Sequence, residues 1–324
     1  MKKLVIICGP TGTGKTDLGV QLCRRFNGEI ISADSRQVYR YTDIGTNKKE
    51  IRDQTCLRRQ GLEIRKGKGY WIQGGIKIHL YDVTTSDKQY SASEFIDAAA
   101  DTVKQIWEQD KLPFVVGGTG FYISALIGEI ELSGVPADQE LRDELFKDSL
   151  ENLQTTLKSL SPGKFNKMNN SEKKNKQRLI RAIEVAIATK LGKNKLKQKR
   201  TPLPPMDILK IGLKAPRKIM YHKADRWAHR IVMSGALIKE TKDLLDRGYR
   251  NTRLLQGMIY APTVSFLDGK LDKNELVKTI QDELRAYIRR QLTWFRRDKE
   301  TKWFDVSKIG FDKEVVKLVE LFLK

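Results

Sequence analysis

Short apolar runs alternate with amphipathic segments along most of the chain, and this alternation predicts strands separated by helices. The runs that have the length and apolar character of buried strands cover residues 4–8, 29–34, 76–83, 112–116 and 207–213. The segments with apolar positions at helical spacing cover residues 17–26, 91–108, 217–247 and 274–297. This order is typical of an α/β protein in which helices flank a parallel sheet.

Local signals set some boundaries of these elements. Ser91 and Glu94 have the spacing of a capping box, in which each side chain binds the other residue's backbone N–H at the start of a helix. Gly248 is suited to the C-terminal cap of the preceding helix, because glycine readily adopts a left-handed backbone. Residues 47–75 are basic and contain several glycines, so we predict a loop with some helix there.

The composition changes between residues 129 and 200, where the chain becomes basic and helical. Residues 147–200 contain fifteen Lys or Arg and four Asp or Glu, a net charge of +11. A proline-rich stretch at residues 201–205 then precedes the strand predicted at 207–213. We therefore predict a core made of residues 1–128 and 201–324, with residues 129–200 inserted as a basic helical domain.

The overall charge narrows the range of functions. The 324 residues carry a formal net charge of +21 and a pI near 9.8. Such a cationic excess indicates a polyanionic partner, most often a nucleic acid. The plainer alternative is a surface that reflects adaptation or a lysine-rich genome.

Cysteine usage and hydropathy indicate a cytoplasmic protein. Cys8, Cys23 and Cys56 lack the spacing of a zinc site, and the first two fall at buried positions of a strand and a helix, so we expect reduced thiols. The apolar N-terminal run is too short for a signal peptide. No apolar stretch approaches the ~20 residues that span a bilayer, so we expect no membrane partner. We also expect a monomer.

Residues 9–16 read GPTGTGKT and lie between the first predicted strand and helix, which is the full context of a phosphate-binding loop. The glycines let backbone N–H groups converge on phosphate oxygens, and the following helix directs its positive end at them. Lys15 supplies a charge for the terminal phosphates, and the Thr16 hydroxyl suits a Mg²⁺ ligand. We predict that a polyphosphate, either ATP or another compound, is bound by Gly9, Pro10, Thr11, Gly12, Thr13, Gly14, Lys15 and Thr16.

Two further strand ends should lie beside this loop, because the carboxyl ends of parallel strands meet at one edge of a sheet. Asp34 ends the second strand and is expected to face the phosphates; a helix cap or a Mg²⁺-orienting carboxylate is the plainer alternative. The sequence GGTG at residues 117–120 follows the strand at 112–116. It either binds anions through its amides or makes a tight turn.

The helix predicted at 274–297 ends with arginines interleaved with aromatic residues, in the sequence RAYIRRQLTWFRR at 285–297. This pattern suits a nucleic-acid surface, because arginines bind phosphates and aromatic rings stack on bases. In the plainer alternative Trp294 and Phe295 pack in the core and the arginines are solvated.

Several motifs together resemble one family, the tRNA dimethylallyltransferases, also called tRNA isopentenyltransferases. The matching stretches occur in family order and are GPTGTGKT (9–16), ISADSRQVYR (31–40), DIGT (43–46), YSASEF (90–95), VVGGTGFYI (115–123), QRLIRAIEV (177–185) and RRQLTWFRR (289–297). They span nearly the whole chain, and ADSRQVY and RQLTWFR are far more specific than the phosphate loop. Because the chain lacks the Cys/His extension of eukaryotic members, a bacterial-type enzyme is expected.

The resemblance implies a P-loop NTPase-like core whose ligand is dimethylallyl diphosphate in place of ATP, and a tRNA-binding insertion. The dimethylallyl group would move to the exocyclic N6 of the adenosine beside the tRNA anticodon. By similarity, Asp34 is the general base for the N6 proton, and Thr119 lies near the reacting groups. Lys15 and Arg217 would stabilise the leaving diphosphate, with Mg²⁺ bound to Thr16.

The resemblance also implies contacts with the tRNA anticodon stem-loop, whose target base must leave its stack to react. The residues that match RNA-contacting positions of the family are Asp34, Ser35, Arg36, Gln37, Thr119, Arg142, Gln177, Arg178, Leu179, Ile180, Arg181, Gln256, Tyr260, Arg285, Arg290, Gln291 and Trp294. The chain departs from the family at Ile259, where a glycine is expected, and at His79, where many members have two histidines.

Three other functions remain open on the residues alone. A small-molecule kinase would share the phosphate loop, but it leaves the basic insertion and the Arg–aromatic helix unexplained. An adenylate isopentenyltransferase acting on free nucleotides predicts a smaller and less basic insertion. A non-catalytic nucleic-acid-binding ATPase module would need an apolar strand ending in an acidic pair, which we do not find in the sequence.

Overall fold

The computed structural model describes residues 1–48, 64–192 and 203–324, and the chain divides into two compact units. The first unit, here called the core, comprises residues 1–130 and 203–324. The second unit, here called the insertion, comprises residues 131–202. The chain therefore leaves the core after residue 130 and returns to it at residue 203.

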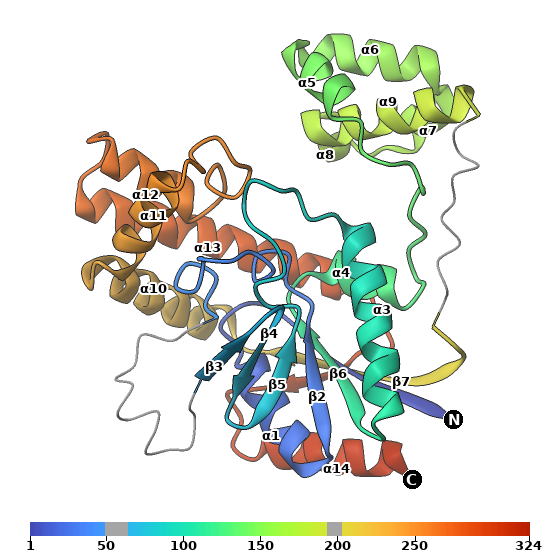
Figure 1. Cartoon of the computed structure of the whole chain (residues 1–324), viewed down its shortest axis with the longest axis vertical. Coiled ribbons are helices and arrows are strands. Elements are labelled where there is room, and N and C mark those ends of the chain that lie inside the picture. The colour runs from blue at the N-terminus through green and yellow to red at the C-terminus, as the bar shows by residue number, and fades with distance from the viewer. Residues whose placement is uncertain (49–63, 193–202) are drawn as a thin grey trace. The chain divides into compact units, whose positions relative to one another are not determined.

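One sheet forms the centre of the core (Figure 1), and within the described residues it has eight strands in the order β3–β4–β5–β2–β6–β1–β7–β8. The strands are β1 (Lys2–Cys8), β2 (Gly28–Ser32), β3 (Ile64–Gly67), β4 (Tyr70–Gln73), β5 (Ile76–His79), β6 (Leu112–Gly117), β7 (Met206–Lys214) and β8 (Lys302–Asp305). Neighbours from β5 to β8 in this order are parallel, whereas β3–β4 and β4–β5 are antiparallel. The predicted α/β class with a largely parallel sheet is confirmed.

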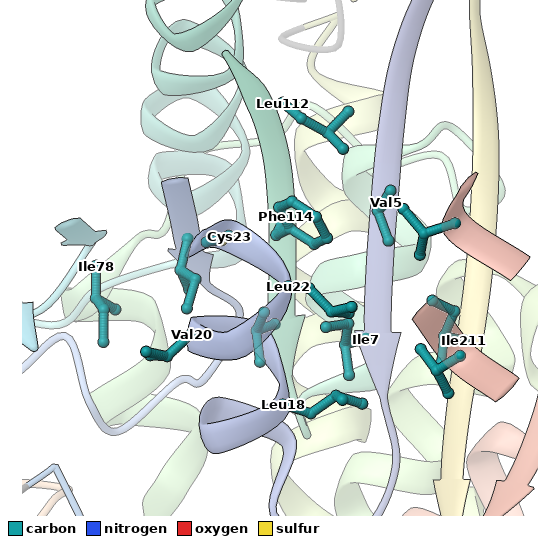
Figure 2. Packing of buried hydrophobic residues seen from close by; sticks show 14 of the residues in the cluster. Val5, Ile7, Leu18, Val20, Leu22, Cys23, Ile78, Leu112, Phe114 and Ile211 are labelled. Carbon is teal, nitrogen blue, oxygen red and sulfur yellow. The ribbon is translucent and has the colours of Figure 1, made fainter. Parts of the chain in front are cut away.

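Helices cover both faces of the sheet, because the central strands are apolar on both sides. All residues of β2 and β6 are buried. On one face, α1 (Lys15–Arg25) and α14 (Phe311–Leu323) share a hydrophobic cluster with the strands, and Figure 2 shows Leu18 and Leu22 packed near Ile7 and Phe114. On the other face lie α3 (Ala92–Glu108) and α4 (Gly120–Leu126).

A second cluster in the core is built by helices that follow β7. These are α10 (Arg217–Met233), α11 (Ala236–Asp246), α12 (Tyr260–Leu267) and α13 (Lys273–Phe295). The single helix predicted over residues 217–247 is wrong, because Gly235 takes a left-handed backbone (φ 76°) between α10 and α11. Ile259, the departure from the family pattern, is 3 % exposed and fills space inside this cluster.

The β3–β4 hairpin corrects the loop predicted at residues 47–75, of which 49–63 lie outside the described residues. Tyr70 and Trp71 favour a strand, and Gly69 (φ 78°) provides the turn. The strand predicted at 76–83 is also too long. β5 ends at His79, since Leu80 (φ 64°) has a left-handed backbone that cannot continue the ladder.

The described part of the insertion, residues 131–192, is helical. Its helices are α5 (Gln139–Lys147), α6 (Leu150–Leu160), α7 (Pro162–Lys167), α8 (Asn170–Lys173) and α9 (Lys176–Lys190). Leu153, Leu157 and Ile183 are fully buried in the insertion's own hydrophobic cluster. The apolar residues of α9 therefore lie on the face that packs inward.

Other local predictions are confirmed where the structure describes them. Ser91 and Glu94 form the capping box of α3. Cys8 and Cys23 are buried free thiols, and Cys56 lies outside the described residues. Across the described ranges, none of the helices combines the length and the apolar character needed to cross a membrane.

Candidate active site

Loops leave neighbouring strands at one edge of the sheet and form the candidate site. Cys8 of β1 is level with Gly117 of β6, and Ser32 of β2 is level with Val116 of β6. The phosphate loop after β1, the segment 33–37 after β2 and the glycine-rich turn after β6 therefore emerge together. Ligands of open α/β sheets bind at such strand ends.

The phosphate loop curls around one of its own carbonyl groups. Lys15 Nζ donates to the Pro10 carbonyl oxygen at 2.8 Å, and Thr13 Oγ1 donates to the same oxygen at 2.9 Å. Gly9 begins the loop at φ 138°, and a Cβ there would lie 2.3 Å from the Leu213 carbonyl oxygen of β7. Glycine is therefore required where the loop passes the neighbouring strand.

Lys15 is held in a poorly solvated position. Burial lowers the pKa of Lys15 to about 8, because desolvation disfavours the ammonium form. The nearby Asp34 carboxylate acts in the opposite direction and raises this pKa. An anionic ligand would stabilise the ammonium further, so the charge of Lys15 is coupled to what the loop binds.

Asp34 and Thr119 lie at the adjoining turns and are both partly exposed. Asp34 Oδ1 accepts a hydrogen bond from the backbone N–H of Arg36 at 2.9 Å. Thr119 Oγ1 accepts one from the backbone N–H of Ser35 at 3.1 Å, and the Thr119 N–H donates to the Ala33 carbonyl oxygen at 3.1 Å. The turn after β6 is thereby attached to the segment that carries the acidic residue.

The next predicted base-contacting residue, Gln37, is tied to its own loop. Its Oε1 accepts from Ser32 Oγ at 2.8 Å, and its Nε2 donates to the Thr46 carbonyl oxygen at 3.1 Å. These bonds connect the end of β2 with the turn at residues 43–46. Gln37 therefore stabilises the loop whatever else it contacts.

The aromatic helix α13 contributes a tyrosine that the sequence analysis missed. Tyr287 lies beside Thr119, and burial together with the Asp34 charge raises the pKa of Tyr287 to about 12. The guanidinium groups of Arg36 and Arg290 lie 5.7 and 5.8 Å from its ring centroid. A flat, cation-flanked ring thus lies beside Asp34. The sequence did carry a signal for this residue, because Tyr287 precedes Arg290 and Gln291 by three and four residues and so lies on the same side of the helix.

The helix α10 carries two basic residues of interest, and one of them lies beside the phosphate loop. Arg217 is exposed at the first residue of α10. The Cβ of Lys223 lies 3.9 Å from where a Cβ on Gly12 would be, so Lys223 is beside the loop. The sequence analysis named only Arg217. One lysine in a basic amphipathic helix carries no local signal that would separate it from its neighbours.

Thr16 is the metal-ligand candidate. It lies beside the buried Tyr81, and its hydroxyl, in the first turn of α1, suits Mg²⁺. Within the described ranges, no group of three or more His, Cys, Asp or Glu side chains could enclose a metal ion. A cation here would therefore be held by few protein atoms and by its ligand's phosphates.

Four of the predicted RNA-contacting side chains are buried, which contradicts direct contacts. Leu179 and Ile180 pack inside the insertion's cluster. Gln291 is 4 % exposed. Tyr260 is 2 % exposed and donates to Glu240 Oε1 at 2.9 Å. Motif matching selects these positions from the sequence but does not show which face of each helix is exposed.

Glu240 explains the position of Tyr260. Its carboxylate also accepts from the backbone N–H groups of Ile44 and Gly45, at 2.7 and 2.9 Å. Burial and the nearby Asp43 raise the pKa of Glu240, although these hydrogen bonds oppose the shift. Tyr260 and Glu240 thus hold the turn at residues 43–46 against α11 and α12.

Several predicted arginines are engaged in ion pairs. In the insertion, Arg142 and Arg181 share the buried Glu184, and Arg181 also donates to the Val135 carbonyl oxygen at 2.7 Å. Arg178 pairs with Glu172 on the surface. The Arg178 side chain is 56 % exposed, so it remains accessible, whereas Arg181 mainly stabilises the insertion.

The remaining predicted residues are exposed or partly exposed on their own units. In the core, Arg285 makes a two-point ion pair with Asp225, at 3.1 and 2.7 Å. Trp294 is half-buried, with its ring 6.2 Å from that of Phe121. Phe295 is buried. The exposed members of the predicted set are Gln177, Arg178, Gln256 and Arg290.

Comparisons with known proteins identify the family. A sequence model described as IPP transferase matches residues 37–298. A tRNA dimethylallyltransferase of Halalkalibacterium halodurans is 35 % identical over 98 % of this chain and 95 % of its own length. One from Acetivibrio thermocellus is 32 % identical over 100 % of this chain and 98 % of its own.

A solved structure agrees with the sequence comparisons. The full-length tRNA isopentenylpyrophosphate transferase of Bacillus halodurans is similar over 100 % of this chain and 96 % of its own, with a TM-score of 0.67 and 33 % identity. The P-loop NTPase-like fold is shared. The chain therefore belongs to the IPP transferase family, the tRNA dimethylallyltransferases.

Proposed function

We propose that this protein transfers a dimethylallyl group from dimethylallyl diphosphate to N6 of the adenosine 3′-adjacent to the tRNA anticodon, and releases diphosphate. One observation carries the proposal: a phosphate loop and a carboxylate lie together at the carboxyl ends of neighbouring strands. Asp34 is close enough to Lys15 to raise the pKa of the lysine. Family membership supplies the identity of both substrates. The enzyme acts in the cytoplasm as a monomer.

The transfer requires a base on one side and an anion site on the other. As N6 bonds to C1 of the dimethylallyl group, the C1–O bond breaks and its electron pair leaves with diphosphate. Asp34 takes the N6 proton, because the adenine amine is a poor nucleophile until that proton departs. Thr119 borders the reacting atoms and holds the backbone of Ser35 beside them.

The leaving diphosphate is stabilised by the phosphate loop. The backbone N–H groups at residues 12–16, the start of α1 and the Lys15 ammonium face the developing negative charge. Arg217 and Lys223 of α10 add positive charge from the solvent side. Mg²⁺ would be held by Thr16 and the phosphates, where it would neutralise part of the charge on the leaving group.

The tRNA is bound by exposed cations and by the aromatic edge of the site. Arg36, Arg290 and the ring of Tyr287 form a platform on which the flipped adenine or its neighbour can stack. Exposed Arg178 and Gln177 of the insertion contact the RNA backbone. Phosphate contacts of this kind position the RNA, and base contacts specify it.

Mass spectrometry of an unmodified tRNA tests the proposal. The protein is incubated with the tRNA, Mg²⁺ and dimethylallyl diphosphate, and nuclease fragments of the tRNA are weighed. A dimethylallyl increment on the adenosine that follows the anticodon is expected. Asp34→Asn serves as the matched control, because it preserves the shape of the site. An increment on free AMP in place of tRNA, or hydrolysis of ATP without transfer, would favour one of the other functions.

A further inference from the structure

Gln291 is a buried side chain that spans two loops of the candidate site. Its Oε1 accepts a hydrogen bond from the backbone N–H of Thr11 at 3.0 Å. Its Nε2 donates to the carbonyl oxygen of Gly118 at 3.0 Å. A Cβ on Gly118 would lie 2.3 Å from Nε2, so the glycine allows the amide to reach the backbone. The side chain of α13 therefore joins the phosphate loop to the turn after β6.

The first peptide group held by Gln291 is also the one that holds Lys15. The Thr11 N–H and the Pro10 carbonyl belong to the same planar peptide unit. Gln291 binds the N–H of this unit, and Lys15 Nζ and Thr13 Oγ1 bind its oxygen. Rotation of the peptide would break all three hydrogen bonds. The amide of Gln291 therefore fixes the orientation of the Pro10 carbonyl and, through it, the position of the Lys15 ammonium.

The second peptide group held by Gln291 positions the acid–base side of the site. The Gly118 carbonyl and the Thr119 N–H form one peptide unit, whose N–H donates to the Ala33 carbonyl oxygen at 3.1 Å. Ala33 directly precedes Asp34. The orientation of this unit therefore sets the spacing between the Thr119 turn and the segment that carries the carboxylate.

We propose that Gln291 is a positioning residue that fixes the distance and orientation of the diphosphate loop relative to the Asp34–Thr119 turn. The inference rests on the proposed function and replaces the RNA contact expected from the family pattern. A neutral amide meets both partners and an ionised carboxylate does not, because one end must accept from an N–H and the other must donate to a carbonyl oxygen. A misplacement of the reacting groups by about 1 Å can cost on the order of 100-fold in rate.

Gln291→Glu is the discriminating variant. The carboxylate still accepts from Thr11 N–H but presents a second acceptor to the Gly118 carbonyl oxygen, which is unfavourable in a buried position. Protonation would restore a donor at that end. At saturating substrates and pH 8, the kcat of Gln291→Glu should therefore be lower than that of the wild type by about tenfold or more. This difference should shrink as pH falls to about 5.5.

Binding measurements separate this role from an RNA contact and from the proposed function itself. The affinity for inorganic diphosphate, measured by calorimetry without tRNA, should fall at pH 8 in Gln291→Glu and recover at low pH. The tRNA affinity should stay within about twofold of wild type, since the side chain is buried. Thr293→Ala, an exposed change two residues along α13, is the matched control and should alter neither quantity.

The outcomes are distinct. A loss of tRNA affinity with unchanged kcat and diphosphate binding would overturn the proposal and make Gln291 an RNA contact. Equal kcat and diphosphate affinity in Gln291→Glu and wild type at every pH would also overturn it. If Gln291→Glu does not fold, Gln291→Asn provides the test, because it keeps the amide but is too short to bridge. If wild-type protein transfers nothing to tRNA, the proposed function fails, and the diphosphate measurements still decide the role of the bridge.

Discussion

Removal of the buried cation at Lys48 should destabilise the core strongly. Its side chain is 0 % exposed, and Nζ lies 2.5 Å from Asp82 Oδ1 and 3.6 Å from Asp43 Oδ1. It also donates to the Tyr39 carbonyl oxygen at 2.6 Å. Asp82 in turn accepts from Trp71 Nε1 at 2.6 Å. The ammonium thus compensates two carboxylates beneath the loop that leads away from Asp34.

Lys48→Met keeps most of the side-chain volume but leaves both carboxylates without their shared cation. Breaking a fully buried pair costs about 3–5 kcal/mol, and the carboxylates are 14 % and 17 % exposed, so we expect about 2–3 kcal/mol. In a unit of this size, 1 kcal/mol corresponds to about 2–4 °C in Tm, so a decrease of roughly 4–12 °C is expected.

Urea unfolding followed by tryptophan fluorescence measures this effect in Lys48→Met, Asp82→Asn and the double variant. The double variant should lose less stability than the sum of the single variants, by at least about 1 kcal/mol, because the Asp82 charge is then no longer left without its cation. Lys239→Met, which breaks the exposed ion pair with Asp243, is the control and should leave the midpoint unchanged. Additive single effects would refute the reasoning, as would a Lys48→Met midpoint equal to that of the control.

Three further predictions concern the site. Asp34→Asn should lower kcat by about 10²–10⁴ and leave tRNA affinity intact; rapid-quench rates within a fewfold of wild type would show that Asp34 is not the base. Because the pKa of Lys15 is lowered to about 8 and diphosphate favours its ammonium form, diphosphate affinity measured by calorimetry should be constant below pH 8 and fall as pH rises through 8. An equal fall in diphosphate affinity through pH 8 in Lys15→Met would show that Lys15 is not the group responsible. Arg178→Ala should flatten the slope of log tRNA affinity against log salt by about 0.7–0.9, whereas Arg181→Ala should instead lower the thermal stability of the insertion. Equal effects of the two changes on the slope would mean that both arginines contact phosphates.

Local rules predicted the features that a few neighbouring residues control. The phosphate loop was recognisable because its chemistry needs glycines and a lysine at set spacing between a strand and a helix. The capping box of α3 was equally local. The hairpin of β3 and β4 was missed because charged residues and glycines obscured its alternation, and its stability comes from pairing with β5 and from the buried Trp71. Gly235 interrupted a helix whose apolar pattern continued through it.

The sequence by itself determined the class of fold, the phosphate loop, the acidic residue after the second strand and the family. Each of these depends on residue types at short spacing or on motifs that follow one another in a fixed order along the chain. Only the tertiary structure decided which side chains of a motif face outward. Arg290 and Gln291 are adjacent in RRQLTWFRR, yet Arg290 flanks the partly buried ring of Tyr287 and Gln291 joins two loops inside the core. Adjacent residues on a helix point about 100° apart, and the packing of α13 against the loops of the sheet, which no local pattern encodes, selects the direction each one takes.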